Sequence, residues 1–406
     1  MRAPSVALDD FAAVIMGQSP PGSTYNTDGD GLPLLNGPTD FADRCPLPTL
    51  FTTDAKRTAA RGDVLFCVRG STTGRMNRAD RDYAIGRGIA AIRGRDPRDT
   101  DFIQYCIEYR LGDLLQLASG STFPNLTARD IGGLIVPYPA DRREVAGILS
   151  AYDDLIQNNY RRIATLEEMG DQIYGEWFVD YRYPGREGMP LVDSDMGQIP
   201  QGWEVRALGA LCSLIQAGGT PPRSSSRYWR DGTVDWYKTA ELRDGFLFGS
   251  VESVSQSAVV DRKTRVFPAG AILMAIYGSP TVGRLGVLAR EGACNQAALA
   301  MVGNAVPQSI LYHMLRGLRG HFNAIAQGAA QQNISKEKVE AARVVCPPPA
   351  LCAAADALLK PILAERRALE EAVRSLRTTR DFLIPWLVAG EGNVEGLAVV
   401  LEGTEG

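Results

Sequence analysis

Two long stretches of the chain carry apolar residues at three-to-four spacing on an otherwise charged background. The first stretch has Ile148, Tyr152, Leu155, Ile156, Ile163, Leu166, Met169, Ile173 and Trp177. The second has Leu351, Leu358, Ile362, Leu369, Val373, Leu376, Leu383 and Leu387. This period predicts two amphipathic helices of about 35 residues each, with Pro361 kinking or locally breaking the second.

Stripes of this length need a surface to cover them, and each stretch is the only comparable partner for the other. We therefore expect the two helices to pair. The alternative, in which each helix packs only on its own domain, stays open at this point.

The remainder of the chain alternates short apolar runs with helical periods. Val64 to Val68 and Ile272 to Tyr277 are buried-strand candidates that lead into glycine-rich turns. Phe102 to Leu117 and Pro307 to Ile325 have helical spacing. The pattern predicts two bodies of mixed strand and helix.

An internal repeat relates these two bodies. The segment Gly62 to Ser71 aligns with Gly270 to Ser279 at an offset of 208 residues, and the Gly-Arg pair at Gly74 follows at 209 in Gly283-Arg284. The stretch from Gly120 to Thr127 matches residues 328–335 at the same offset. Each half then reaches a proline-rich hinge before its long helix, so the order of elements occurs twice.

Composition narrows the class of protein. The chain has 406 residues, 45% hydrophobic and 22% charged, which is typical of a globular protein with two to three domains. No apolar run approaches the length of a membrane span, and the amino terminus lacks the apolar stretch of a signal peptide, so we expect no membrane association and a cytoplasmic location.

Charge is distributed unevenly. Residues 201–348 carry 16 Lys or Arg against 10 Asp or Glu, whereas residues 141–200 carry 6 against 12. A basic segment suits a polyanion, and an acidic helical segment suits a protein partner better than a phosphate backbone.

Seven scattered cysteines without a Cys-x-x-Cys pair indicate neither a disulfide framework nor a zinc site. Only His313 and His321 are available for histidine chemistry, and for both we favour a structural role. We therefore expect no bound metal and no cofactor held by this chain.

The turns Gly70 to Arg75 and Gly278 to Arg284 resemble a phosphate loop, but neither has the Lys-[Ser/Thr] ending that nucleotide phosphates and Mg²⁺ require. Backbone N–H groups, hydroxyls and Arg in such a turn suit a polynucleotide phosphate or a guanine edge. A plain tight turn with an exposed Arg is the alternative.

Amides and hydroxyls fall at matching points of the two halves, around Asn125 and Asn333. Asn and Gln pair bidentately with adenine, although both Asn could instead cap the helical segments that follow. Loops rich in donors and aromatic rings also occur early in each half, at Gly17 to Tyr25 and at Ala217 to Tyr228.

From these motifs we predict a set of DNA-contacting residues. In the first half they are Gln18, Ser19, Thr24, Tyr25, Arg69, Ser71, Thr72, Thr73, Arg75, Thr122, Phe123 and Asn125. In the second half they are Thr220, Arg223, Tyr228, Tyr277, Ser279, Thr281, Arg284, Gln331, Gln332 and Asn333. We predict no catalytic residues, because no paired-carboxylate constellation repeats between the halves and the dinucleotide and amino-methyltransferase fingerprints are absent.

Taken together, these residues resemble the specificity subunit of type I restriction-modification systems. The resemblance rests on the opening Gly17 to Pro20, the Gly62 to Arg75 and Gly120 to Thr127 segments, Gly202-Trp203 at the start of the second half, and the ending Arg380 to Glu391. Ala389 stands where that family usually has Ser, and Gln331-Gln332 replaces the Phe-Pro of the first half.

The resemblance implies an α+β chain in which two similar target-recognition domains are separated by two long helices paired as an antiparallel coiled coil. It places the domains at 1–140 and 181–348, the helical regions at 141–180 and 349–390, and a tail at 391–406. Each domain would read one half of a bipartite, gapped site in double-stranded DNA, and the helices would set the spacer.

The resemblance also implies partners. Modification subunits, expected to number two, would dock on the helices and bring S-adenosylmethionine, and restriction subunits would bring ATP and Mg²⁺. The docking residues would be Ile148, Tyr152, Leu155, Ile163, Leu166, Ile173, Leu358, Ile362, Leu369, Leu376 and Leu383.

Two other functions remain open from the sequence. One is a non-catalytic scaffold or adaptor of a phage-defence complex that does not read bases. The other is a nucleotide-dependent protein that uses the Gly-Arg turns.

Overall fold

A computed structural model describes residues 3–42, 44–118, 125–278, 281–326 and 333–392. The chain forms two compact units. Unit 1 contains residues 1–157 and 375–406, and unit 2 contains residues 158–374. The helices α5 (Arg142–Tyr174) and α10 (Pro349–Val388) contribute to both units, so the division passes through the helices instead of beside them.

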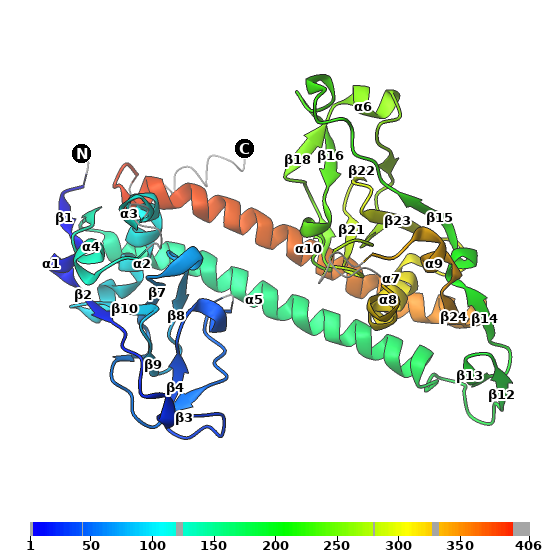
Figure 1. Ribbon diagram of the computed structural model, residues 1–406, viewed down its shortest axis with the longest axis horizontal. Helices are drawn as coiled ribbons and strands as arrows, with labels where there is room; N and C mark the ends of the chain where they lie inside the picture. The colour runs from blue at the N-terminus through cyan, green and yellow to red at the C-terminus, as the bar shows by residue number, and fades with distance from the viewer. Residues whose placement is uncertain (1–2, 43, 119–124, 279–280, 327–332, 393–406) are drawn as a thin grey trace. The chain divides into compact units, whose positions relative to one another are not determined.

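Unit 1 is built on a four-stranded antiparallel sheet in the order β2-β10-β7-β8 (Figure 1). Its strands are β2 (Ala12–Met16), β10 (Ile89–Gly94), β7 (Val64–Cys67) and β8 (Met76–Arg78). A second sheet has the order β3-β5-β4-β9-β6. It consists of β3 (Tyr25–Asn26), β5 (Phe51–Thr52), β4 (Leu32–Leu35), β9 (Tyr83–Ile85) and β6 (Thr58–Ala59).

The apolar run in β7 is continuous because both faces of its sheet are buried. Val64 and Phe66 face a core shared with the helices, while Leu65 and Cys67 face a second core shared with the five-stranded sheet. The helices of this body are α1 (Leu8–Phe11), α2 (Thr100–Tyr109), α3 (Leu111–Ala118) and α4 (Ala128–Gly132).

Unit 2 repeats this plan. Its larger sheet has the order β15-β23-β20-β21-β17 and its smaller sheet the order β18-β16-β22-β19. The larger sheet contains β15 (Cys212–Ala217), β23 (Ala298–Gly303), β20 (Ile272–Ala275), β21 (Leu285–Leu288) and β17 (Phe246–Leu247). The smaller contains β18 (Glu252–Val254), β16 (Val234–Tyr237), β22 (Gly292–Cys294) and β19 (Val266–Phe267).

The helices of unit 2 are α6 (Gln256–Val260), α7 (Gln308–Gly317), α8 (Arg319–Ile325) and α9 (Lys336–Ala341). In unit 2, α7, α8 and α9 follow β23 as α2, α3 and α4 follow β10 in unit 1, whereas α6 lies between β18 and β19 and has no counterpart among the described helices of unit 1. A hairpin of β12 (Leu191–Ser194) and β13 (Gly197–Pro200) precedes the body. The residues of β20 alternate between two cores as those of β7 do, with Ile272 and Met274 on one side and Leu273 and Ala275 on the other.

Each body closes by pairing its first strand with its last. β1 (Ser5–Ala7) pairs antiparallel with β11 (Ile135–Pro137), and β14 (Glu204–Ala207) pairs antiparallel with β24 (Arg343–Cys346). The chain therefore leaves each body at a fixed point, directly before α5 or α10.

The two long helices pair antiparallel, as the sequence predicted. In unit 1, Arg380 of α10 forms an ion pair with Asp153 of α5. In unit 2, Arg366 contacts Glu167 at 2.7 Å and Glu365 contacts Arg162 at 2.6 Å. Low residue numbers in α5 thus meet high numbers in α10. The helices also pack on the bodies, so each helix is covered both by its partner helix and by the bodies, and the alternative of packing on its own domain alone is wrong.

The two shorter helical stretches are confirmed, whereas the local break predicted at Pro361 does not occur. The helical stretches near residues 110 and 318 are each two helices, α2 with α3 and α7 with α8, and the breaks at Arg110 and Leu318 lie at the repeat offset. Conversely, α10 runs unbroken through Pro361. Pro361 and Ala357 are both exposed, so the carbonyl that lacks an intrahelical donor faces water, while the buried neighbour Leu359 holds the turn in place.

A buried guanidinium fixes α10 to unit 2. The Arg366 side chain is 4% exposed and donates to Glu370 at 2.7 Å, to the Tyr312 hydroxyl at 2.8 Å and to the Asp244 carbonyl. It also pairs with Glu167 of α5. Burial raises the pKa of Glu370, and Arg366 acts in the opposite direction.

We predict that Arg366→Met destabilises unit 2 by about 3–5 kcal/mol, because it leaves buried acceptors without their cation. Urea unfolding followed by tryptophan fluorescence reports mainly this unit, which contains four of the five Trp, namely Trp177, Trp203, Trp229 and Trp236. Lys360→Met is the matched control on an exposed position of the same helix, with an expected change within about 0.5 kcal/mol. Equal losses in the two variants would contradict the prediction.

Candidate nucleic-acid interface

The glycine-rich turns after β7 and β20 are braced from within. Gly70 and Gly278 have φ angles of 78° and 90°, in the left-handed region that favours glycine. The Thr73 hydroxyl donates to the Gly70 carbonyl at 2.8 Å, and the Thr281 hydroxyl donates to the Gly278 carbonyl at 2.8 Å. The hydroxyl hydrogens of these two predicted contact residues are therefore used in hydrogen bonds within the turn.

In each unit the structure brings this turn next to the amide motif. Arg69 bridges to Asn125, and its Nε donates to the Asn125 Oδ1 at 3.0 Å. Tyr277 bridges to Asn333 in the same way through the backbone. Thr127 and Ser335 are the residues that cap α4 and α9 through their side chains, so the interpretation of the two Asn as caps is wrong.

Arg75 and Arg284 occupy the same turn position but differ in their contacts. The Arg75 guanidinium donates to the carbonyls of Pro38 and Phe41, each at 3.3 Å. Arg284 is half-buried, and its side chain has no hydrogen-bond partner among the residues that the structure describes. Ser71 is exposed, and the Thr72 hydroxyl lies 3.5 Å from the Cys67 sulfur.

A second cluster forms where the early loop of each body meets the sheet that contains β9 in unit 1 or β22 in unit 2. A Cβ at Gly17 would collide with the Gly86 carbonyl, and one at Gly218 with the Cys294 carbonyl, so both positions require glycine. Beside them, the Gln18 N–H donates to the Ile85 carbonyl at 2.9 Å, and the Thr220 hydroxyl donates to Gln296.

Four further predicted residues are held by local partners. The Ser19 hydroxyl accepts from the Arg87 N–H at 3.4 Å. The Thr24 hydroxyl lies 2.8 Å from both the Pro21 carbonyl and Thr52, and the Tyr25 hydroxyl donates to Pro20 at 3.3 Å. Tyr228 is only 4% exposed, so its ring belongs to the core of the smaller sheet and not to a contact surface.

The Arg223 guanidinium stacks 3.7 Å from the centre of the Trp229 ring and pairs with Glu252. Hydrogen bonds from Arg223 and Lys238 hold the pKa of Glu252 below its usual range. The charge of Arg223 is therefore compensated at neutral pH.

Five of the predicted contact residues lie outside the described residues: Thr122, Phe123, Ser279, Gln331 and Gln332. One basic turn, Arg262 to Arg265, was missed by the sequence reasoning. Its signal was present as three cations in four residues within the basic segment.

The described part of the chain has no group of three His, Cys, Asp or Glu side chains arranged to hold a metal ion. No disulfide joins the seven cysteines, all of which lie within the described residues. His313 is buried and hydrogen-bonded to Asp171 at 3.0 Å, which is the structural role expected for it. Among the described helices, none has both the length and the apolar content for crossing a membrane.

Comparison with known proteins decides the family. A family model described as the type I restriction modification DNA specificity domain matches the chain twice, over residues 5–168 and 200–350. The chain belongs to this family. It is a specificity subunit of the type I restriction-modification class.

Named relatives and a solved structure agree. The MjaIX specificity subunit of Methanocaldococcus jannaschii is 23% identical over 83% of this chain and 79% of its own length. The HindI specificity subunit of Haemophilus influenzae is 20% identical over 83% of this chain and 88% of its own. The crystal structure of the S subunit from M. genitalium has a TM-score of 0.62 at 15% identity and covers 95% of this chain and 96% of that one, which shows the same fold.

The helical residues predicted to dock partners of the specificity subunit are mostly covered by the chain itself. Ile163, Leu369 and Leu383 are buried. Six more are half-buried: Ile148, Tyr152, Leu166, Ile173, Ile362 and Leu376. Only Leu155 and Leu358 of the set, at 52% and 45%, are exposed. The apolar stripe thus belongs to the helix pair and the two cores, because the same spacing that predicts a helix also marks its covered face.

We predict that Arg75→Ala lowers the stability of the specificity subunit by about 1 kcal/mol through loss of its carbonyl hydrogen bonds. Arg284→Ala, at the same turn position, is the matched control and is expected to change stability by less than about 0.5 kcal/mol. Chemical denaturation of both variants measures the difference. Weaker DNA binding of Arg75→Ala at unchanged stability would show instead that Arg75 contacts DNA.

Proposed function

We propose that each body of this specificity subunit reads one half of a bipartite, gapped site in double-stranded DNA. The observation that carries the proposal is the double match of the DNA specificity domain, over residues 5–168 and 200–350. Two copies of one recognition fold in a single chain suit two half-sites.

The halves are proposed to read different sequences. Arg69 in unit 1 corresponds to Tyr277 in unit 2, so the residue bridged to the repeated Asn changes from a guanidinium to a phenol. Arg pairs bidentately with guanine, whereas Tyr offers one hydroxyl and a ring. The paired helices α5 and α10 are proposed to set the untouched spacer between the half-sites.

Chemistry is assigned to the partners. Modification subunits, proposed to number two, would carry S-adenosylmethionine and methylate adenine, and restriction subunits would carry ATP and Mg²⁺. The chain itself is proposed to be non-catalytic, because the matched family model describes a DNA specificity domain.

The first test replaces one recognition body. Residues 1–140 are exchanged for the corresponding body of another specificity subunit, the chain is co-expressed with its modification subunit, and N6-methyladenine is mapped in host DNA by single-molecule sequencing. We expect a gapped motif in which only one half changes. Exchange of residues 201–348 is the matched control and should change the other half. Methylation at no defined motif would favour a scaffold without base reading.

The second test shortens the helix pair. Deleting residues 154–160 from α5 together with 373–379 from α10 keeps Asp153 with Arg380 and Glu167 with Arg366. Seven residues of helix span about 10 Å, equivalent to about three base pairs at about 3.4 Å each. We expect the preferred spacer to change while both half-sites stay the same. An unchanged spacer in the methylation motif would contradict the role given to the helices.

A further inference from the structure

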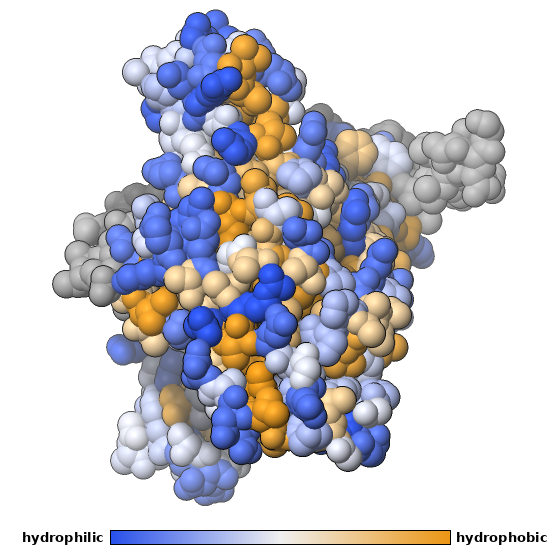
Figure 2. All heavy atoms as spheres, turned by 90° about the vertical axis from the view of Figure 1, so that its right-hand side faces the viewer, coloured by the Kyte–Doolittle hydropathy of each residue, from blue (hydrophilic) through white to orange (hydrophobic). Residues whose placement is uncertain are grey.

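The turn Arg262 to Arg265, between α6 and β19, carries three cations that the protein leaves uncompensated. Arg262, Lys263 and Arg265 are exposed, and among the described residues none has an ion-pair partner within 4.0 Å. Arg262 has a φ of 54°, a left-handed backbone that Arg adopts rarely, so the turn is held open by its surroundings. Figure 2 shows hydrophilic side chains beside a hydrophobic strip over the end of unit 2 that carries α6.

The carboxylates nearby are already used by other cations. Asp261 pairs with Arg227, and Asp235 pairs with Arg290 at 2.7 Å. Glu252 is shared between Arg223 and Lys238. The three charges of the turn therefore face outward without a local counter-charge, which is the electrostatic footprint of a polyanion site.

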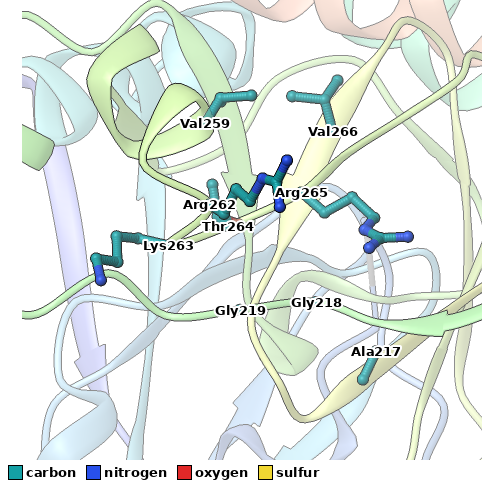
Figure 3. A pocket seen from close by; sticks show the side chains of 9 residues that line it. All are labelled: Ala217, Gly218, Gly219, Val259, Arg262, Lys263, Thr264, Arg265 and Val266. Carbon is teal, nitrogen blue, oxygen red and sulfur yellow. The ribbon is translucent and has the colours of Figure 1, made fainter.

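The turn borders a cavity of about 510 Å³ that is lined by Ala217, Gly218, Gly219, Val259 and residues 262–266. Figure 3 shows the Lys263 and Arg265 side chains leaving the turn in opposite directions, with Arg262 between them. Gly218 and Gly219 line one wall without side chains, and their N–H groups already donate to the carbonyls of Ala298 and Cys294, so the cations are the groups that this cavity offers to an anion.

Thr264 supplies a second, independent observation. Its side chain lines this cavity and the residue is 7% exposed, yet its Oγ1 has no hydrogen-bond partner in the described part of the chain. A buried hydroxyl without a partner costs stability, so an acceptor from outside would satisfy it.

Unit 1 lacks this arrangement. The offset of 208 residues places Asp54, Ala55, Lys56 and Arg57 at the equivalent positions. Lys56 pairs with Asp54 at 2.7 Å, so of these positions only Arg57 carries a charge without an ion pair to a described residue. The site is therefore a property of the second body and not of the shared fold.

We propose that residues 262–265, at the edge of this cavity, form a phosphate-binding site for the backbone of double-stranded DNA. Adjacent point charges on long side chains suit phosphates strung along a strand, and such contacts position a protein without reading sequence. This inference rests on the proposed function and gives the second body a sequence-independent anchor that the first does not have.

The test measures salt-dependent DNA affinity of the complex with its modification subunit. The variant is Arg262→Ala/Lys263→Ala/Arg265→Ala, and the probes are a random-sequence duplex and a duplex carrying the methylated motif. Between about 50 and 200 mM salt, log affinity falls by about 0.9 per phosphate contact for each unit of log salt. We expect the slope to become shallower by about 0.9 to 2.7 on both probes, with the ratio of the two affinities unchanged.

The matched control is Lys336→Ala/Lys338→Ala, which removes two cations from α9 in the same unit. An unchanged slope in this control supports a local contact. Equal changes of slope in the two variants would show an effect of net charge alone and would overturn the proposal. A triple variant with the wild-type slope would also overturn it, as would a loss of affinity confined to the motif duplex. If the wild-type complex binds both duplexes alike, the proposed function fails, while the slope on random DNA still decides the phosphate site.

Thr264→Val separates binding from folding. Removing an unpartnered hydroxyl should raise the unfolding temperature of the free complex, and the loss of a hydrogen bond to a charged phosphate should weaken DNA binding by about tenfold. A lower unfolding temperature would show that the hydroxyl has a protein partner, and unchanged DNA affinity would remove Thr264 from the site.

Discussion

The need to cover two very long amphipathic helices governs this structure. Helices α5 and α10 contain 33 and 40 residues, and each body covers only part of each stripe. The start of α5 packs into the core of unit 1 together with the end of α10, through Val145, Leu149, Leu383 and Leu387. In unit 2 the start of α10 packs with the body that precedes it, while Ile173 and Tyr174 of α5 lie against the same core. Each core contains segments of both α5 and α10. The antiparallel pairing therefore follows from the order of elements along the chain, because each body buries the start of one long helix together with the end of the other.

The surfaces of the two bodies that pack against the long helices carry opposite charges at one repeat position. Glu108 on α2 and Arg316 on α7 stand at the same repeat position. Burial raises the pKa of Glu108 while the nearby Arg380 of α10 lowers it, and Arg316 pairs with Asp171 of α5 at 2.8 Å. In the mismatched arrangement, an Arg would face an Arg and a carboxylate would face a carboxylate, which disfavours exchange of the two bodies. Apolar packing thus stabilises both helix-packing surfaces, and the charges of Glu108 and Arg316 determine which helix end each surface accepts.

The sequence predicted the elements whose causes are local or periodic. The stripe in α5, the buried run in β7 and the offset of 208 residues all reflect patterns that a single chain displays. It failed where a distant partner decides. Tyr228 is drawn into a core, Arg75 is held by carbonyls more than 30 residues away, and Pro361 is tolerated because it faces water. None of these outcomes is encoded within a few residues of the side chain concerned.

The turn Arg262 to Arg265 lies outside the repeated segments that relate the two bodies. Comparing the halves selects residues that recur, and recurring residues such as Thr73 with Thr281, or Asn125 with Asn333, serve the fold that the two bodies share. Contacts that only one body makes must lie where the two halves differ. Arg262 to Arg265 faces a cavity in one body, and the equivalent positions of the other hold an ion pair. Residues that recur in both halves therefore mark the shared fold, and residues that differ between the halves mark where each body makes its own contacts with DNA.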